Sequence, residues 1–136
     1  KYPGMNEAVV KLLCDIRKAH PNVKLMLNRG FDVLTEAAIC IDMVLAESTR
    51  TDLQLSGKKK PKRVKDEDYN WYVSKLKEAQ AANPALTVYS LDYWPMKDTK
   101  GVARIYAEQR ANGFIPYVST IDLQKIYPES RSKCAH

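Results

Sequence analysis

The sequence predicts an α/β fold built on parallel β-strands. Four short apolar runs, 23–27, 43–46, 86–91 and 114–118, are separated by segments with the spacing of amphipathic helices. An alternation of strands and helices is typical of α/β folds. Because the runs are apolar nearly throughout, instead of alternating with polar residues, they indicate strands buried on both faces of a helix-covered parallel sheet.

Two helices are expected before the second strand. The first covers residues 8–19, where apolar side chains fall on one stripe and Pro21 follows the end of the helix. A second, short helix is expected over 33–39. The stripe of the first helix consists of Ala8, Val9, Leu12, Leu13, Ile16 and Ala19.

Three further helices complete the pattern. One begins near Asp66, where three acidic residues in a row suit the positive end of the helix dipole. Another begins near Asp98 and Thr99, either of which can cap it, and ends at Gly113. A last, short helix is expected over 122–126. The apolar stripe of the helix from Asp66 consists of Tyr69, Tyr72, Leu76 and Ala79.

The predicted order is one helix followed by four strand–helix units in a single domain, residues 1–136. The chain is 45% hydrophobic, which is enough for a core. A small doubly wound sheet and half of an eight-stranded barrel both fit this order. The opening helix has no preceding strand, as expected if an N-terminal half has been removed.

The positive charge is concentrated in one segment. The formal net charge is +6, and six basic residues lie between Lys58 and Lys65. A dedicated nucleic-acid binder is expected to be basic over a whole face, so nucleic acid is not a predicted partner. The run is interpreted as a solvated loop. The alternative is contact with a polyanion, which predicts affinity that falls steeply with salt.

The three cysteines are Cys14, Cys40 and Cys134. The first two lie in apolar helical patterns and are expected to be small, buried, inert core residues rather than a disulfide. No apolar stretch approaches the roughly 20 residues that a membrane span needs, and no targeting segment is recognised. No membrane partner is therefore expected.

Polar residues follow every predicted strand. In parallel α/β folds the reacting groups gather at the carboxyl ends of the strands. Amides, carboxylates and aromatic faces at these positions suit sugar recognition. The four strand ends are Asn28-Arg29-Gly30, Glu47-Ser48, Asp92-Tyr93-Trp94 and Ser119-Thr120.

Glu47 is the candidate catalytic residue. It directly follows an apolar strand, so partial desolvation is expected to raise its pKa toward the operating pH, as a general acid requires. The alternative is a structural salt bridge with Arg29 or Arg50. Both interpretations place the side chain at the end of the second strand.

Asn28, Arg29 and Asp92 also have two interpretations each. Asn28 binds a substrate hydroxyl or caps its loop, and Arg29 meets an anionic group or pairs with Glu47. Asp92 binds substrate hydroxyls or holds loop amides. Tyr93 and Trp94 are expected to stack on sugar, whereas Trp71, at helical spacing, is expected in the core.

No metal site or cofactor is expected. His20 and His136 lack partners for a metal or a catalytic triad, and the chain has no glycine-rich phosphate loop, nucleophile elbow or Cys/His cluster. Nucleotide, serine-hydrolase and zinc chemistry therefore lack support.

The strand ends resemble, in order and spacing, the second half of glycoside hydrolase family 114. The resemblance rests on Leu-Asn-Arg-Gly-Phe at 27–31, Ala-Glu-Ser at 46–48, Leu-Asp-Tyr at 91–93 and Gly-Phe-Ile-Pro-Tyr-Val-Ser at 113–119. It implies the C-terminal half of a TIM-type β/α barrel that cleaves α-1,4-linked galactosamine or N-acetylgalactosamine exopolysaccharide without a cofactor. It also implies a secreted or periplasmic protein.

The resemblance further implies that Glu47 is one of two catalytic carboxylates. The other belongs to a strand that would precede the first helix, so the catalytic pair is expected to be incomplete in this chain. A half-barrel is expected to pair with a second copy or with an N-terminal half. The alternative function is a small α/β carbohydrate-binding or interaction module without catalysis.

Overall fold

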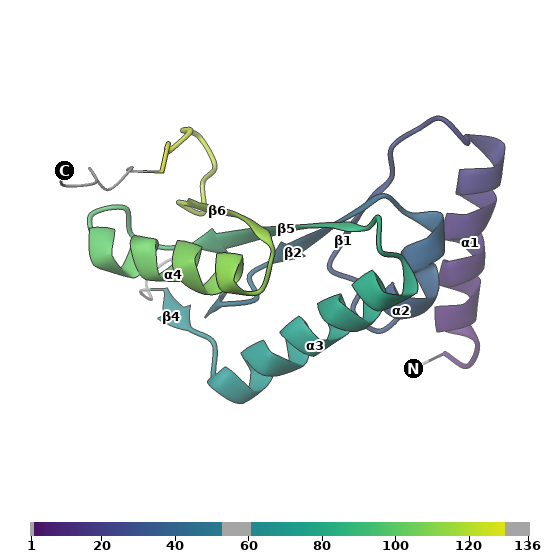
Figure 1. Cartoon of the computed structure of the whole chain (residues 1–136), viewed down its shortest axis with the longest axis horizontal. Coiled ribbons are helices and arrows are strands. Elements are labelled where there is room, and N and C mark those ends of the chain that lie inside the picture. Colours follow the sequence, from purple (N-terminus) through teal and green to yellow (C-terminus); the bar gives the residue numbers. More distant parts are fainter. Residues whose placement is uncertain (1, 53–60, 130–136) are drawn as a thin grey trace.

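The computed structural model describes residues 2–52 and 61–129. Four strands form one sheet in the order β1-β2-β5-β6, and all neighbouring pairs are parallel (Figure 1). The strands are β1 (Met26–Asn28), β2 (Met43–Glu47), β5 (Thr87–Tyr93) and β6 (Ile115–Ser119). The predicted strands are confirmed, each within a few residues. Four adjacent parallel strands with surrounding helices form part of a TIM-type barrel.

Helices cover one face of this sheet. They are α2 (Leu34–Ala37), the 3-10 turn η1 (Ala38–Cys40), α3 (Asp66–Ala82) and α4 (Thr99–Ala111). Figure 1 shows α3 and α4 lying on the same side of the strands. Strand residues Val44, Ala46 and Val88 pack against α2 and α3, and Val118 packs against α4. Burial of these apolar side chains holds the layers together.

The opposite face of the sheet is open in the described structure, and we call it the uncovered face. Its residues alternate with the buried ones along each strand, so that Met43, Leu45 and Tyr89 are only partly buried. Met26 is 47% exposed and Ile115 is 51% exposed. The expectation of burial on both faces is therefore wrong for this chain. In a closed barrel this face would point to the interior, which explains its apolar composition.

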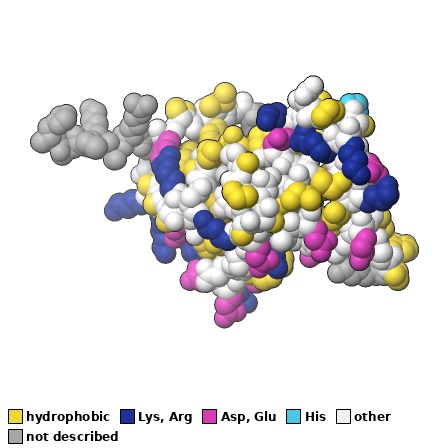
Figure 2. Space-filling model, turned by 45° about the vertical axis from the view of Figure 1, so that its right-hand side comes forward, with side chains coloured by type: hydrophobic (Ala, Val, Ile, Leu, Met, Phe, Trp, Pro, Cys, Tyr) yellow, Lys and Arg dark blue, Asp and Glu magenta, His cyan; other side chains and the backbone are white. Residues whose placement is uncertain are grey.

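Helix α1 (Met5–Ala19) stands at one end of the molecule, beside α2 and η1 (Figure 1). None of its residues is buried. Leu12 of its predicted stripe is 58% exposed, and Tyr2, just before the helix, is 80% exposed. Figure 2 shows hydrophobic side chains at the surface, among basic and acidic ones. The apolar stripe of α1 thus lacks a full partner within the described residues.

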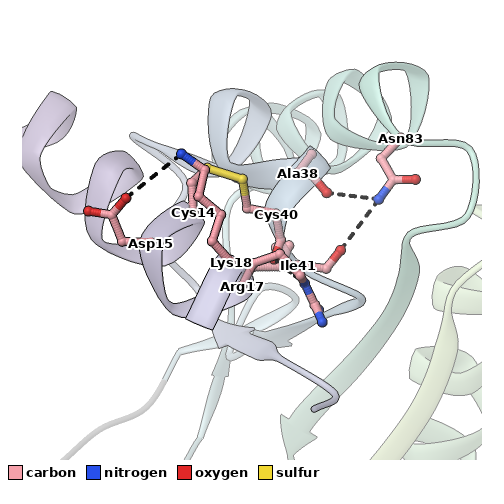
Figure 3. Close-up of a disulfide and its surroundings, with 8 residues drawn as sticks. All are labelled: Cys14, Asp15, Arg17, Lys18, Ala38, Cys40, Ile41 and Asn83. Atoms are coloured by element: carbon pink, nitrogen blue, oxygen red, sulfur yellow. Dashed lines mark hydrogen bonds and ion pairs between the residues drawn. A yellow bond between two sulfur atoms is a disulfide. The ribbon is translucent and has the colours of Figure 1, made fainter. Parts of the chain in front are cut away.

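A disulfide between Cys14 and Cys40 links α1 to η1, with their Cα atoms 5.0 Å apart. The expectation of two inert free thiols is wrong, because α1 lies against η1 instead of inside a core. Figure 3 shows the bond and, next to it, Asn83, which donates to the backbone oxygens of Ala38 (2.8 Å) and Ile41 (3.4 Å). The same turn is therefore fixed from α1 and from the end of α3.

Two other expectations change. Residues 122–126 form no helix, and β3 (Thr51–Asp52) pairs with β4 (Lys62–Arg63) in a short antiparallel ladder that the sequence did not suggest. Lys58, Lys59 and Lys60 of the basic run lie outside the described residues. None of the described helices is long and apolar enough to cross a membrane.

Candidate active site

The two-residue period of a strand decides which strand-end side chains meet. Asn28 lies opposite Leu45, and Glu47 lies opposite Leu91, in the parallel register. Glu47 therefore shares the uncovered face with Asn28 and with Tyr93, which comes two residues after Leu91. Parallel strands place all three side chains at one edge of this face.

Glu47 accepts a hydrogen bond at each carboxylate oxygen. The Tyr93 hydroxyl donates to Oε1 at 2.6 Å, and the Asn28 amide donates to Oε2 at 2.9 Å. Tyr93 is 5% exposed, whereas Asn28 is exposed at the edge strand. The Glu47 carboxylate is thus held by one buried residue and one exposed residue.

These donors hold the pKa of Glu47 below its ordinary value. The Tyr93 hydrogen bond is the largest cause, followed by the Asn28 hydrogen bond; partial burial opposes them, and the charge of Arg29 adds to the lowering. The predicted rise in the pKa of Glu47 is therefore wrong, because donors to the charged form outweigh desolvation. Burial, together with the bond to Glu47, raises the pKa of Tyr93, so Tyr93 stays a donor.

Arg29 does not pair with the Glu47 carboxylate. Its backbone has φ 59°, and its guanidinium donates to the backbone oxygen of Glu47 and, at 3.4 Å, to that of Ser48. The guanidinium carbon lies 5.2 Å from the ring centre of Phe31 and 5.3 Å from that of Tyr72. Arg29 consequently joins the strand ends to an aromatic cluster formed by Phe31, after β1, and Tyr72, on α3.

Arg50 does not pair with the Glu47 carboxylate either. Its guanidinium pairs with Glu108 at 2.7 Å and with Asp66 at 2.8 Å. Arg63, from the basic run, donates to the same Glu108 carboxylate at 2.5 Å. The structural salt bridge considered for Glu47 is therefore absent from the described contacts, and part of the basic run serves an internal ion-pair network.

Asp92 faces the helices, on the side of the sheet opposite Glu47. It is fully buried and accepts hydrogen bonds from the backbone N–H groups of Arg50 (2.9 Å) and Thr51 (3.0 Å) and from the Gln109 amide (2.6 Å). Burial raises the pKa of Asp92 above its ordinary value, although the hydrogen bonds from these donors act to lower it. Of the two interpretations of Asp92, these contacts favour the one in which it holds loop amides.

Trp94 packs on the start of α4. Its indole N–H donates to Asp98 at 2.8 Å, and Asp98 caps the helix by accepting from the backbone N–H of Gly101 at 3.0 Å. The ring lies against the cluster formed by Val102 and its neighbours. The predicted cap at Asp98 is confirmed, and the structure gives Trp94 a packing role.

The aromatic cluster around Arg29 was not predicted from the sequence. Phe31 and Tyr72 lie with ring centres 4.8 Å apart, and Trp71 lies 5.3 Å from Tyr72. Trp71 is 45% exposed, so its predicted core position is wrong. The signal was present in the sequence, since Phe31 directly follows Arg29-Gly30 and two aromatic residues are adjacent on α3.

The residues that the structure describes contain no group of three or more His, Cys, Asp or Glu side chains placed to hold a metal ion. The candidate site is instead built from one carboxylate, one phenol and one amide. Such a set can bind hydroxyl-rich ligands and carry proton-transfer or nucleophilic chemistry through the carboxylate.

Four adjacent parallel strands, with the Glu47 carboxylate at their carboxyl ends, form part of a β/α barrel. Two solved structures are similar to this chain. The glycoside hydrolase domain of PelA from Pseudomonas aeruginosa matches with a TM-score of 0.73 and 26% identity, over 90% of this chain and 47% of that chain. A variant of that domain, with a glutamate replaced by alanine, matches with a TM-score of 0.73 and 25% identity over the same shares.

The chain therefore has a glycoside hydrolase-like fold. It fits a family 114-like, PelA-type domain, and it spans about half the length of the domains it matches. No protein-family model and no curated protein matches the chain.

Proposed function

We propose that this chain is the C-terminal half of a glycoside hydrolase that cleaves α-1,4-linked galactosamine or N-acetylgalactosamine polymers. The observation that carries the proposal is the Glu47 carboxylate, held by Tyr93 and Asn28 at the carboxyl end of a parallel strand. Catalytic groups of β/α barrels lie at this end.

Glycoside hydrolysis requires a second carboxyl group across the scissile bond. The two lie about 5 Å apart in retaining enzymes and farther apart in inverting ones. Glu47 is the only carboxylate among the strand residues of the uncovered face that the structure describes. The second carboxyl group therefore comes from the complementary half of the barrel.

The contacts of Glu47 support a particular part for it in the proposed reaction. In this half, hydrogen bonds from Tyr93 and Asn28 favour the ionised form of Glu47, which supports a role in which Glu47 attacks the anomeric carbon or takes a proton from the attacking water. The partner carboxyl group gives its proton to the leaving oxygen as the glycosidic bond breaks. Asn28, exposed beside Glu47, also reaches a sugar hydroxyl. Asp92 stays behind the sheet and holds the strand end.

The uncovered face is the surface that receives the complementary half. It is largely apolar, and its edge strands β1 and β6 have free sides within the described residues. A four-stranded β/α half, from a preceding segment or from a second copy, closes the barrel. Light scattering that shows a stable monomer of the isolated chain, with no binding of such a half, contradicts this pairing.

We also propose export to the periplasm or the cell exterior. The support is the Cys14–Cys40 disulfide, because such bonds persist in oxidising compartments. Thiol titration of protein isolated from each compartment tests the proposal. Cys14 and Cys40 modified as free thiols in exported protein contradict it.

The alternative, a carbohydrate-binding module without catalysis, is separated by measuring binding and cleavage together. A galactosamine polymer is titrated into the completed barrel by calorimetry, and the products are analysed by mass spectrometry. The enzyme proposal predicts that Glu47→Gln still binds the polymer but no longer releases reducing ends. Glu36→Gln, an exposed control on α2, should both bind and cleave the polymer. Binding without any cleavage by the native completed barrel supports the module instead.

A further inference from the structure

A pocket of about 460 Å³ lies between α1, the end of β1 and the first turns of α3. The proposed cleavage site does not include it. Its lining contains the Phe31, Trp71 and Tyr72 rings, with Arg29 and Asp32 as the charged groups. Pockets that combine aromatic surface with a few polar groups are typical ligand sites.

The three rings hold one another in a fixed arrangement. Phe31 meets Trp71 edge-on at 6.0 Å between ring centres, and Trp71 meets Tyr72 edge-on at 5.3 Å. Phe31 is 8% exposed, whereas Trp71 is 45% exposed. Buried Phe31 and partly buried Tyr72 therefore brace a tryptophan ring whose surface remains in solvent, and covering that surface with an apolar ligand face is favourable.

Arg29 makes the pocket continuous with the Glu47 site. The same guanidinium donates to the backbone oxygen of Glu47 and, at 3.4 Å, to the Tyr72 hydroxyl. A polymer that passes over the ends of β1 and β2 therefore meets Glu47 on one side of Arg29 and the aromatic rings on the other.

The charges of the pocket select among sugars. Arg29 is partly buried and lies against the Phe31 and Tyr72 rings, whereas Asp32 is exposed, so solvent screens the acidic charge more than the basic one. A protonated amino sugar is repelled by the guanidinium, and an N-acetylated sugar is not. The pocket consequently favours a neutral ring.

We propose that this pocket is a second sugar-binding subsite, in which Trp71 stacks on a neutral, N-acetylated pyranose ring of the polymer. The inference rests on the proposed function, because it takes the polymer cleaved at Glu47 as its ligand. It adds a position in the chain of subsites and a preference for acetylated units there.

The two tryptophans of the chain allow a direct test by NMR. The indole N–H signals of Trp71 and Trp94 are assigned with Trp71→Phe and followed while an α-1,4-linked N-acetylgalactosamine hexasaccharide is added to the full chain. We expect the Trp71 signal to shift and saturate. The fully deacetylated hexasaccharide is expected to bind at least about threefold more weakly, from the charge difference at Arg29.

Matched variants separate stacking from general damage. Trp71→Ala is expected to weaken hexasaccharide binding about tenfold, and Trp71→Phe, which keeps a ring, about threefold or less. Ile39→Ala, at a position that is 71% exposed and outside the pocket lining, is expected to change nothing. An unmoved Trp71 signal at saturation, or unchanged affinity in Trp71→Ala, overturns the subsite.

The Glu47→Gln chain keeps this test independent of catalysis. A Trp71 shift in that variant, with no cleavage by the native completed barrel, leaves the subsite standing and removes the proposed enzyme. Cleavage that depends on Glu47, with no Trp71 shift for any hexasaccharide, removes the subsite and leaves the enzyme standing.

Discussion

The hydroxyl of Tyr93 lies 2.6 Å from the Glu47 carboxylate, although the two residues are 46 positions apart in the chain. The contact exists because β2 and β5 are parallel neighbours and both side chains point to the uncovered face. Asn28, from β1, completes the set. Donors from two other strands, β5 and β1, therefore favour the ionised form of the candidate catalytic residue.

Replacing Tyr93 by phenylalanine should raise the pKa of Glu47, because the largest cause of its lowering is removed. The side-chain carboxyl carbon signal of Glu47, followed by NMR across a pH titration, measures this. Tyr89→Phe, at a position on the same face of β5, is the matched control and should leave the titration unchanged. A Glu47 titration that is the same in Tyr93→Phe and in the native chain would show that the hydrogen bond has no effect in solution.

The same substitution should change the acid sensitivity of the fold. A carboxyl group with a lowered folded-state pKa stabilises the fold above its unfolded pKa, and this stabilisation is lost as the pH falls through the folded value. Tyr93→Phe should therefore lose less unfolding free energy on acidification below about pH 4.5 than the native chain. Urea unfolding at a series of acidic pH values is the measurement, and parallel losses in the two proteins would contradict the linkage.

Asp92→Ala should destabilise the fold by about 3 kcal/mol, because it leaves buried donors without an acceptor. These donors are the backbone N–H groups of Arg50 and Thr51 and the side-chain amide of Gln109. Asp92→Asn keeps one acceptor oxygen and should lose about 1 kcal/mol. Denaturant unfolding compares the three proteins. Equal stability of Asp92→Ala and the native chain would mean that the network does not hold the strand end.

Removing the Cys14–Cys40 disulfide by Cys14→Ser should reduce the unfolding free energy by about 3 kcal/mol. Since no residue of α1 is buried, the amides of α1 should also exchange faster with solvent. Leu12→Ala, at an exposed position of the same helix, serves as the control for changes on α1 itself. Unchanged exchange in α1 after Cys14→Ser would show that other contacts, such as those of Arg17 with Cys40 and Asp42, suffice to hold the helix.

Gly101→Ala should separate Trp94 from Asp98. A Cβ at Gly101 would lie 2.3 Å from Trp94 Nε1 and 2.3 Å from Asp98 Oδ2, so both side chains must move. Loss of the cap lowers the free energy of unfolding by about 1 kcal/mol. The better helix propensity of alanine raises it by about as much. We expect little change in stability but a clear shift of the Trp94 indole N–H signal. Asp98→Ala loses the cap without the gain in helix propensity at position 101, so its free energy of unfolding should fall by about 1 kcal/mol. An unmoved Trp94 indole signal in Gly101→Ala would contradict the close packing of Trp94 and Asp98 on Gly101.

The order of the elements and their approximate bounds could be predicted from the sequence, because apolar runs and helical stripes are local signals. The face of the sheet to which each strand-end side chain points depends on the strand register, which the sequence alone does not give. Asp92 and Tyr93 are adjacent on one strand, so only one of them can share a face with Glu47. The register decides which: Glu47 lies opposite Leu91, and Tyr93, two residues further on, points to the same face.

The errors came from contacts between distant segments. The pKa of Glu47 depends on donors from two other strands, which a strand-end position alone does not reveal. The Cys14–Cys40 bond depends on where α1 docks, and the apolar stripe of α1 gave no indication that it would remain largely exposed. The apolar composition of the strands predicted burial on both faces, as in a closed barrel. In this chain one face of the sheet is open.

The release of reducing ends from an α-1,4-linked N-acetylgalactosamine polymer tests most directly whether Glu47 is a catalytic carboxylate. The measurement compares the native chain, Glu47→Gln and Glu36→Gln, each completed by the complementary half-barrel. We predict cleavage by the native protein, a rate lower by at least about 100-fold in Glu47→Gln, and an unchanged rate in Glu36→Gln. Cleavage by Glu47→Gln within a few fold of the native rate would contradict the assignment.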